Sequence, residues 1–481
     1  ENTKELISVI DPKSWSLSSV PTRIENYNDK TGVTSGYDRA LLAWYSVDPL
    51  FTRRSSSLTP GHIKSDLEQL SDHRVREVYV KELYPNRDQS TYNGATSTLS
   101  VLNLAYYPQE RGPYNLTTQF NADGTLTNPS KKWGGMMRKL ATTDLEQANI
   151  EYVEFWLMDP FIYQRRDGTA AQYAGDLYIN LGEVSEDVLR DGKKFYESGM
   201  PVDGSQSFSY TQWGKIPEQA TQTYAFATTT GSRVLQDVGL NGMNDDEERA
   251  YGAYKEWLDQ IGTVVQNDSL LEVWRNDPAA DDYHYYRGSD FDDAQTSILD
   301  RYKRINNPQG NSPDTDNRTE SYDTSYKMGP DVEDINQDYT LNEYERYFQY
   351  RVRISDDDLQ AYNNGMASDT YITDRRDSYV KLRNGDSLTV RWYQFRIPLA
   401  ECKERVGNIN DFTSIRFMRM YLTGFEKPIV LRFGILDLVR GQWRQYKQSL
   451  LTATGAETGT MEMSAVNIEE NTDRQPVAYT L

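Results

Sequence analysis

The sequence predicts a mainly β fold with minor α content: two jelly-roll or β-sandwich-like units joined by an acidic, loop-rich and partly helical segment. Stretches of alternating polar and apolar residues, typical of half-buried strands, occur in two separate parts of the chain. Aromatic residues make up 12% of the 481 residues, which suits strands and excludes a disordered acidic chain. The length exceeds that of one ordinary hydrophobic core, so several units are expected.

Residues 1–97 are predicted to form an N-terminal subdomain of mixed structure. The apolar run at 41–45 ends in an Asp-Pro break, which is typical of a strand or helix boundary. The apolar residues Ile63, Leu67 and Leu70 follow with helical spacing. This part of the chain is therefore expected to contain short strands and helices.

The two jelly-roll-like units are predicted at 98–236 and 346–450. The strand at 150–157, IEYVEFWL, parallels the strand at 415–422, IRFMRMYL, as an internal repeat would. Alternating strands followed by a turn and a second strand favour an antiparallel sandwich or jelly roll. The alternative is that unrelated strand pairs look alike because all half-buried strands alternate.

The segment between them, 237–345, is rich in Asp, Asn, Gly, Ser and Pro and is predicted to be loop-rich. Two stretches with helical spacing interrupt it, at 251–265 and 294–302. The last residues, 451–481, are weakly patterned, and we interpret them as a C-terminal connection.

Composition excludes several classes of function. With 52 basic and 72 acidic residues the formal net charge is −20, which disfavours binding to nucleic acid. The mean hydropathy of −0.76 leaves no apolar run of the roughly 20 residues that a membrane-spanning helix needs. One cysteine and three histidines provide almost no ligands for a zinc site.

The sharpest local motif is DINQDYTLNEYE at 334–345, called here the calcium-like loop. Oxygen-bearing side chains occupy positions 1, 3, 5, 7, 9 and 12 of the loop, the spacing found in Ca²⁺-binding loops. They are Asp334, Asn336, Asp338, Thr340, Asn342 and Glu345. Tyr339 stands where such loops have Gly for a sharp turn, so a solvated acidic turn is the alternative.

A second acidic loop, DVGLNGMNDDEE at 237–248, is a further candidate metal site. Its potential ligands are Asp237, Asn241, Asn244, Asp245, Asp246 and Glu248. Their spacing fits no single ligand template, and the alternative is a helix start with acidic residues in its first turn.

Catalytic motifs are weak, and the chain is predicted not to be an enzyme. Glu151, Glu154 and Asp159 are the candidates for the carboxylate pair of a glycosidase, but Glu151 and Glu154 should point to opposite faces of one strand. Cys402 has no histidine nearby in the sequence and is interpreted as a bystander. Aromatic residues at 283–286 and 344–350 suit packing more than ligand stacking.

Several long phrases together resemble the SprA/Sov family of gliding-motility and type 9 secretion translocons of the outer membrane. In order along the chain they are YYPQERGPYN (106–115), KKWGGMMRKL (131–140), NIEYVEFWLMDPF (149–161), DVGLNG (237–242), NNPQGNSP (306–313), DVEDINQDYTLNE (331–343) and YFQYRV (347–352). The similarity extends from about residue 15 to residue 445.

The resemblance implies a very long parent chain whose β-barrel forms a channel for folded cargo proteins. It also implies three kinds of partner: secreted cargo, a companion outer-membrane barrel protein at a lateral gate, and a periplasmic plug. This chain lacks the repeated alternating hairpins of a barrel wall, so it is expected to be an extramembrane insertion at the cell surface.

The function expected from the resemblance is that of a non-enzymatic module which braces the channel mouth and contacts cargo or partner subunits. Bound Ca²⁺ is the one cofactor expected, at the acidic loops. The alternative function is that of a surface glycan-binding jelly-roll module, which would require an exposed aromatic platform.

Overall fold

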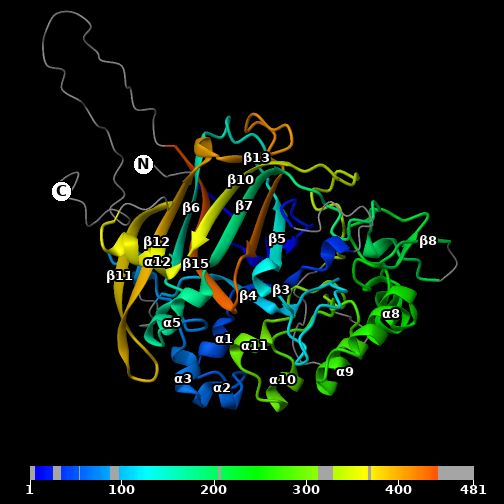
Figure 1. Cartoon of the computed structure of the whole chain (residues 1–481), viewed down its shortest axis with the longest axis horizontal. Coiled ribbons are helices and arrows are strands. Elements are labelled where there is room, and N and C mark those ends of the chain that lie inside the picture. Colours follow the sequence, from blue (N-terminus) through cyan, green and yellow to red (C-terminus); the bar gives the residue numbers. More distant parts are fainter. Residues whose placement is uncertain are drawn as a thin grey trace, which may run out of the picture.

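The computed structural model describes most of the chain up to residue 441. The described ranges are 6–24, 34–53, 55–86, 97–203, 207–311, 329–366 and 370–441. Two antiparallel sheets lie at the centre, and short helices gather at one end and one side of them (Figure 1). The tail at 451–481, interpreted above as a connection, lies outside the described residues.

The larger sheet has seven strands in the order β11-β12-β6-β15-β4-β3, and β1 also pairs with β15. In chain order the strands are β1 (Leu6–Ser8), β3 (Ala40–Tyr45), β4 (Leu102–Arg111), β6 (Ile150–Met158), β11 (Ile372–Lys381), β12 (Ser387–Pro398) and β15 (Ile429–Arg440). All its neighbouring pairs run antiparallel.

The smaller sheet has six strands in the order β13-β10-β7-β14-β5-β2. In chain order they are β2 (Ser16–Leu17), β5 (Trp133–Lys139), β7 (Gly175–Glu183), β10 (Arg346–Ile354), β13 (Glu404–Val406) and β14 (Phe417–Thr423). A separate two-stranded hairpin is formed by β8 (Phe208–Tyr210) and β9 (Lys215–Pro217).

Each central sheet combines strands from both predicted β units. In the larger sheet β6 lies between β12 and β15, and in the smaller sheet β7 lies between β10 and β14. The mainly β fold class is confirmed, and the structure adds that the two units share their sheets. Alternation along a strand reports which face is buried, but it contains no information on which strand is the neighbour.

A single cluster of buried apolar side chains joins the two sheets. In the larger sheet Phe155 stacks on Phe395 with ring centroids 4.8 Å apart and meets Phe433 edge-on at 5.3 Å. Ile179 and Met420 of the smaller sheet belong to the same cluster. Because both sheets bury their apolar faces here, the strands of distant sequence regions depend on one another for stability.

The helices are short. They are α1 (Pro49–Thr52), α2 (Gly61–Ser65), α3 (Leu67–Ser71), α4 (Val80–Leu83), α5 (Ile162–Arg166), α6 (Ser232–Gln236), α7 (Asp245–Ala250), α8 (Gly252–Ile261), α9 (Asp268–Asn276), α10 (Ser289–Asp293), α11 (Ile298–Arg301) and α12 (Asp356–Asn363). Single 3-10 turns occur at Pro12–Ser14, Thr34–Gly36, Pro129–Lys131, Ala170–Tyr173, Glu197–Gly199 and Leu399–Glu401. The helical stretch from α7 to α11 agrees with the predicted partly helical segment.

Helices α8 and α9 are anchored to the larger sheet through strand β4. Trp257 of α8 and Trp274 of α9 are buried with ring centroids 5.8 Å apart. The guanidinium carbon of Arg111, at the end of β4, lies 4.1 Å from the Trp257 ring centroid. This contact holds the helical segment and its acidic residues against the sheet.

No helix among the described residues is long and apolar enough to cross a membrane.

Candidate functional site

The first residue of the calcium-like loop is buried and already hydrogen-bonded. Asp334 Oδ1 accepts the Asp338 amide at 3.0 Å, and Oδ2 accepts the Tyr339 amide at 3.0 Å. The hydroxyls of Tyr196 and Tyr224 also donate to Asp334 Oδ2. The Asp334 carboxylate therefore organises the loop through neutral donors.

The middle of the loop is held by its own side chains. Asn336 Nδ2 donates to Asp338 Oδ2 at 3.0 Å, and Asp338 Oδ1 accepts the Thr340 amide at 2.9 Å. Tyr339 has a φ of 65°, the left-handed conformation for which such loops usually have Gly. Tyr339 therefore adopts the left-handed turn conformation, although its side chain disfavours that conformation.

The end of the loop points into the smaller sheet. Glu345 forms a bidentate ion pair with Arg419 at 3.0 and 2.8 Å and accepts the Ser185 amide at 3.1 Å. Asn342 Nδ2 donates to the Val184 carbonyl at 2.7 Å. The structure thus brings the first four predicted ligands together and gives Asn342 and Glu345 partners in the sheet, while Ca²⁺ binding by this loop stays a prediction.

Two buried glutamates that the sequence reasoning missed hold the calcium-like loop in place. Glu186 accepts the Ile335 amide at 2.7 Å, and Glu333 accepts the Val188 amide at 2.9 Å. Burial raises the pKa of Glu333 well above its ordinary range and that of Glu186 to about 7, with Asp334 adding to the latter. A sequence with 72 acidic residues contains no signal that separates these two from solvated ones.

We expect the Glu186→Gln variant to gain stability relative to the wild type as the pH rises from 5 to 7. The pKa of Glu186 is raised from 4.5 to about 7, so its full contribution to stability is present below pH 4.5 and is lost as the pH rises from 4.5 to about 7. Glutamine does not titrate, so the difference in unfolding free energy should change by about 1 kcal/mol per pH unit. Urea denaturation at several pH values in EDTA measures it, and a pH-independent difference would contradict the raised pKa.

Three residues of the second acidic loop have structural roles. Asp237 pairs with Arg233 at 2.8 Å, and Asp246 pairs with Arg249. Asn244 is the N-cap of α7, where its side chain accepts the Glu247 amide at 3.1 Å. The alternative interpretation from the sequence, a helix start with acidic residues in its first turn, describes this part of the loop.

The remaining members of that loop face a set of carboxylates that the sequence reasoning did not connect with it. Asn241 Nδ2 donates to Glu248 Oε1 at 2.5 Å. Two triads of carboxylates share one residue, and within each triad the three ligand oxygens lie within 4.8 Å of one another. They are Asp245, Glu248 and Asp277 in one triad and Asp277, Asp281 and Asp282 in the other, together called here the acidic cluster.

Acidic side chains are thus close enough to hold a metal ion in this cluster. Burial, the largest cause, raises the pKa of Glu248 and of Asp282 to about 8, and that of Asp245 to about 6. The nearby Asp277 carboxylate raises all three further. A sequence search for alternating ligands could not find the cluster, since its halves come from α7 and from the segment after α9.

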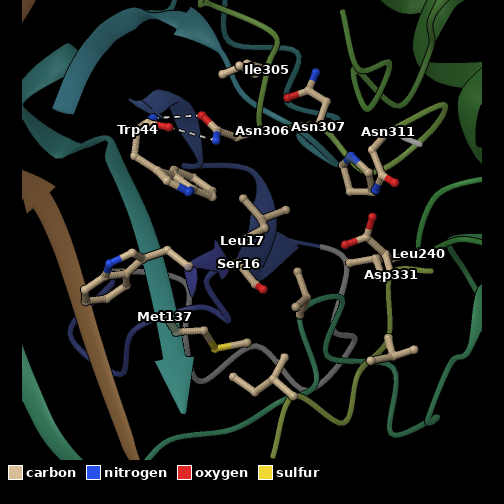
Figure 2. Close-up of a pocket in the computed structure, with 15 residues that line it drawn as sticks. Ser16, Leu17, Trp44, Met137, Leu240, Ile305, Asn306, Asn307, Asn311 and Asp331 are labelled. Carbon is tan, nitrogen blue, oxygen red and sulfur yellow. Dashed lines mark hydrogen bonds between the residues drawn. The ribbon is translucent and has the colours of Figure 1, made fainter. Parts of the chain in front are cut away.

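A narrow pocket lies between the N-terminal segment, β3 and the residues that follow α11 (Figure 2). Asn306 closes one side of it: its Oδ1 accepts the Trp44 amide at 2.7 Å, and its Nδ2 donates to the Trp44 carbonyl at 3.0 Å. An edge strand presents such unpaired groups, so Asn306 takes the place of a neighbouring strand for β3. The lining of the pocket is largely apolar and includes Leu17 and Met137.

The residues considered for glycoside hydrolysis are engaged elsewhere. Glu154 pairs with Arg396 at 2.6 Å, and Asp159 pairs with Arg165 at 3.0 Å. Glu151 is exposed. The thiol of Cys402 donates to the Glu404 carbonyl at 2.9 Å.

The fold and the acidic clusters define a mainly β, two-sheet protein module with buried charged groups. Residues 256–481, just under half of the chain, match the SprA_N family model, described as a motility related/secretion protein. Over this region the resemblance to the SprA family inferred from the sequence is confirmed. No curated protein matches the chain.

Proposed function

We propose that the chain is a non-enzymatic extramembrane module of an outer-membrane protein translocon of type 9 secretion. In this role it braces the channel mouth at the cell surface and contacts secreted cargo or partner subunits. The family match at 256–481 supports the secretion context. The observation that carries the bracing role is the sharing of both sheets between the family-matched region and residues 102–183.

Buried cations that join distant segments support a rigid scaffold. Arg39 is almost fully buried and donates to the carbonyls of Pro113, Ser18 and Val188, each at 3.2 Å. Arg432 donates to Asn103 Oδ1 at 2.8 Å and to the Arg76 carbonyl at 2.9 Å. Such hydrogen-bonded cations hold the loops against the sheets, because moving a loop away would leave a buried guanidinium without its acceptors.

The surface charge supports contact with passing proteins rather than with membranes. A net charge of −20 repels anionic glycolipids and keeps a module soluble beside cargo. The alternative, a glycan-binding module, requires an aromatic platform. Among the described residues, the highly exposed tyrosines Tyr210, Tyr344 and Tyr379 belong to β8, the loop before β10 and β11.

We expect the immobilised full chain to retain secreted cargo proteins or the companion barrel protein from detergent-solubilised envelope and culture-medium proteins. The matched control is the same chain immobilised after thermal denaturation, which keeps the sequence but lacks the native packing. Mass spectrometry identifies retained proteins, and sugar analysis identifies polysaccharide. Retention of polysaccharide alone would favour the glycan-binding function, and equal retention by the control would show unspecific binding.

A further inference from the structure

The acidic cluster is built from two helices and the turn that follows them. The capping box of Asn244 and Glu247 sets the start of α7, from which Asp245 and Glu248 project. Helix α9 ends before Asp277, and the Asp281 amide then donates to Asp277 Oδ1 at 3.0 Å. The turn therefore directs the carboxylates after α9 toward those of α7.

The cluster contains a buried carboxylate with little hydrogen bonding. Asp281 is 0% exposed, and among the described residues neither of its oxygens meets a donor in full hydrogen-bond geometry. The Tyr114 hydroxyl accepts the Leu240 amide at 2.8 Å and directs its own proton toward the Asp281 carboxyl, the one side-chain donor that interacts with it among the described residues. Gly239, at a φ of 69°, packs directly against this carboxyl, where any side chain would collide. Burying a carboxylate with so few hydrogen bonds is costly, and a cation bound in the cluster would offset that cost.

Of the arginines near the cluster, only Arg304 forms a direct ion pair with it among the described side chains. Arg304 pairs with Asp277 at 2.5 Å, with roughly a third of its side chain exposed. Arg111 directs its Nε to the Asn115 carbonyl at 2.7 Å and another donor to the Pro278 carbonyl. Arg249 donates to the carbonyls of residues 275 and 276 and pairs with Asp246. Five carboxylates thus face one directly paired cation among the described side chains.

We infer that the acidic cluster binds a divalent cation of the Ca²⁺ type, with Asp281 and Asp282 as ligands together with Asp245, Glu248 and Asp277. All candidate ligands are carboxylate oxygens, which hard cations prefer. Ca²⁺ takes six to eight oxygens in flexible geometry, whereas Mg²⁺ usually keeps several waters and binds one or two carboxylates. Only Asp245 and Glu248 belong to the loop at 237–248, so the site differs from the ligand set that the sequence indicated.

A bound cation would join three parts of the fold. Glu248 Oε2 accepts the Ala279 amide at 2.9 Å, and the Ala279 carbonyl accepts the Tyr114 amide at 2.7 Å. The site thus links α7, the turn after α9 and the segment that follows β4. Because the unfolded chain does not hold these carboxylates together, binding stabilises the folded state by RT ln(1 + [L]/Kd).

The test uses the full chain, stripped with EDTA, and compares thermal unfolding at pH 8 with Ca²⁺, Mg²⁺ or no added metal. We expect Ca²⁺ at 100 times its Kd to stabilise the wild type by about 2.7 kcal/mol. Asp282→Asn, a half-buried position, should melt at a higher temperature than the wild type without metal and bind Ca²⁺ at least tenfold more weakly. Terbium luminescence, sensitised by the nearby Tyr114 and Trp257, measures binding independently of unfolding.

The matched control is Glu256→Gln, an exposed carboxylate of α8 outside both loops, which should leave both readouts as in the wild type. Asp281→Asn provides a second variant of the cluster, in which binding should also weaken at least tenfold. The inference is overturned by a wild type that shows neither a thermal shift nor terbium binding at millimolar concentration. It is equally overturned if Asp338→Asn removes the response while Asp282→Asn keeps it, since the cation would then occupy the calcium-like loop.

Discussion

Replacing Glu345 by alanine is expected to reduce the free energy of unfolding by about 3–5 kcal/mol, because a buried cation loses its counter-charge. Arg419, in the centre of β14, is 0% exposed and forms two hydrogen bonds with Glu345 at 3.0 and 2.8 Å. Its remaining partners are neutral: Asn180 Oδ1 at 2.8 Å and Ser19 Oγ at 3.2 Å. These dipoles cannot replace a carboxylate around a desolvated guanidinium.

Denaturant titration followed by circular dichroism measures this loss, and two variants serve as controls. Glu404 pairs with Arg23 at 2.8 Å, but both side chains are about 40% exposed, so Glu404→Ala should cost under about 1 kcal/mol. The double variant Glu345→Leu, Arg419→Met removes both charges and should be less destabilised than the single variant. A loss below about 1 kcal/mol in Glu345→Ala would contradict the importance of the pair.

The same variant tests the calcium-like loop. If Glu345 acted as the twelfth-position ligand of a bound cation, its removal would cost more stability with Ca²⁺ than with EDTA. The ion pair with Arg419 predicts a loss that is the same in both conditions. The comparison therefore separates a structural role of Glu345 from a metal-binding one.

Phe155→Ala is expected to destabilise the chain by about 3–5 kcal/mol, the usual cost of deleting a buried aromatic ring. Phe155 is 0% exposed and lies in the centre of β6, opposite Phe395 of β12 and Leu436 of β15. Its ring contacts Phe395 and Phe433, both contributed by the region after residue 346. Truncation leaves a cavity between strands of the two predicted β units.

The form of the unfolding curve is as informative as its midpoint. Because both units share their sheets, Phe155→Ala should shift one cooperative transition seen by both far-ultraviolet circular dichroism and tryptophan fluorescence. The control is Tyr379→Ala on β11, where the side chain is 76% exposed and the expected change is within about 0.5 kcal/mol. Two separate transitions, with only one shifted, would show that the units fold independently.

The local parts of the candidate sites could be predicted from the sequence. The ligand-like spacing of the calcium-like loop indicated a turn, and Tyr339 adopts its left-handed conformation although the sequence counted that side chain against it. The acidic residues in the first turn of α7 agree with the helix start that the sequence offered as the alternative to a metal loop. The turn of the calcium-like loop and the start of α7 both depend on residues a few positions apart. Neighbouring side chains therefore specify the local backbone conformation.

The mainly β class and the positions of strand β6 and helix α8 could be predicted from the sequence, because periodicity reports which face of an element is buried. The neighbours of each strand, the pairing of Glu345 with Arg419 and the approach of Asp245 to Asp277 could be seen only in the folded chain. These contacts join residues separated by tens to hundreds of positions. Their formation depends on how the sheets and helices pack, which no local pattern of charges or apolar residues specifies.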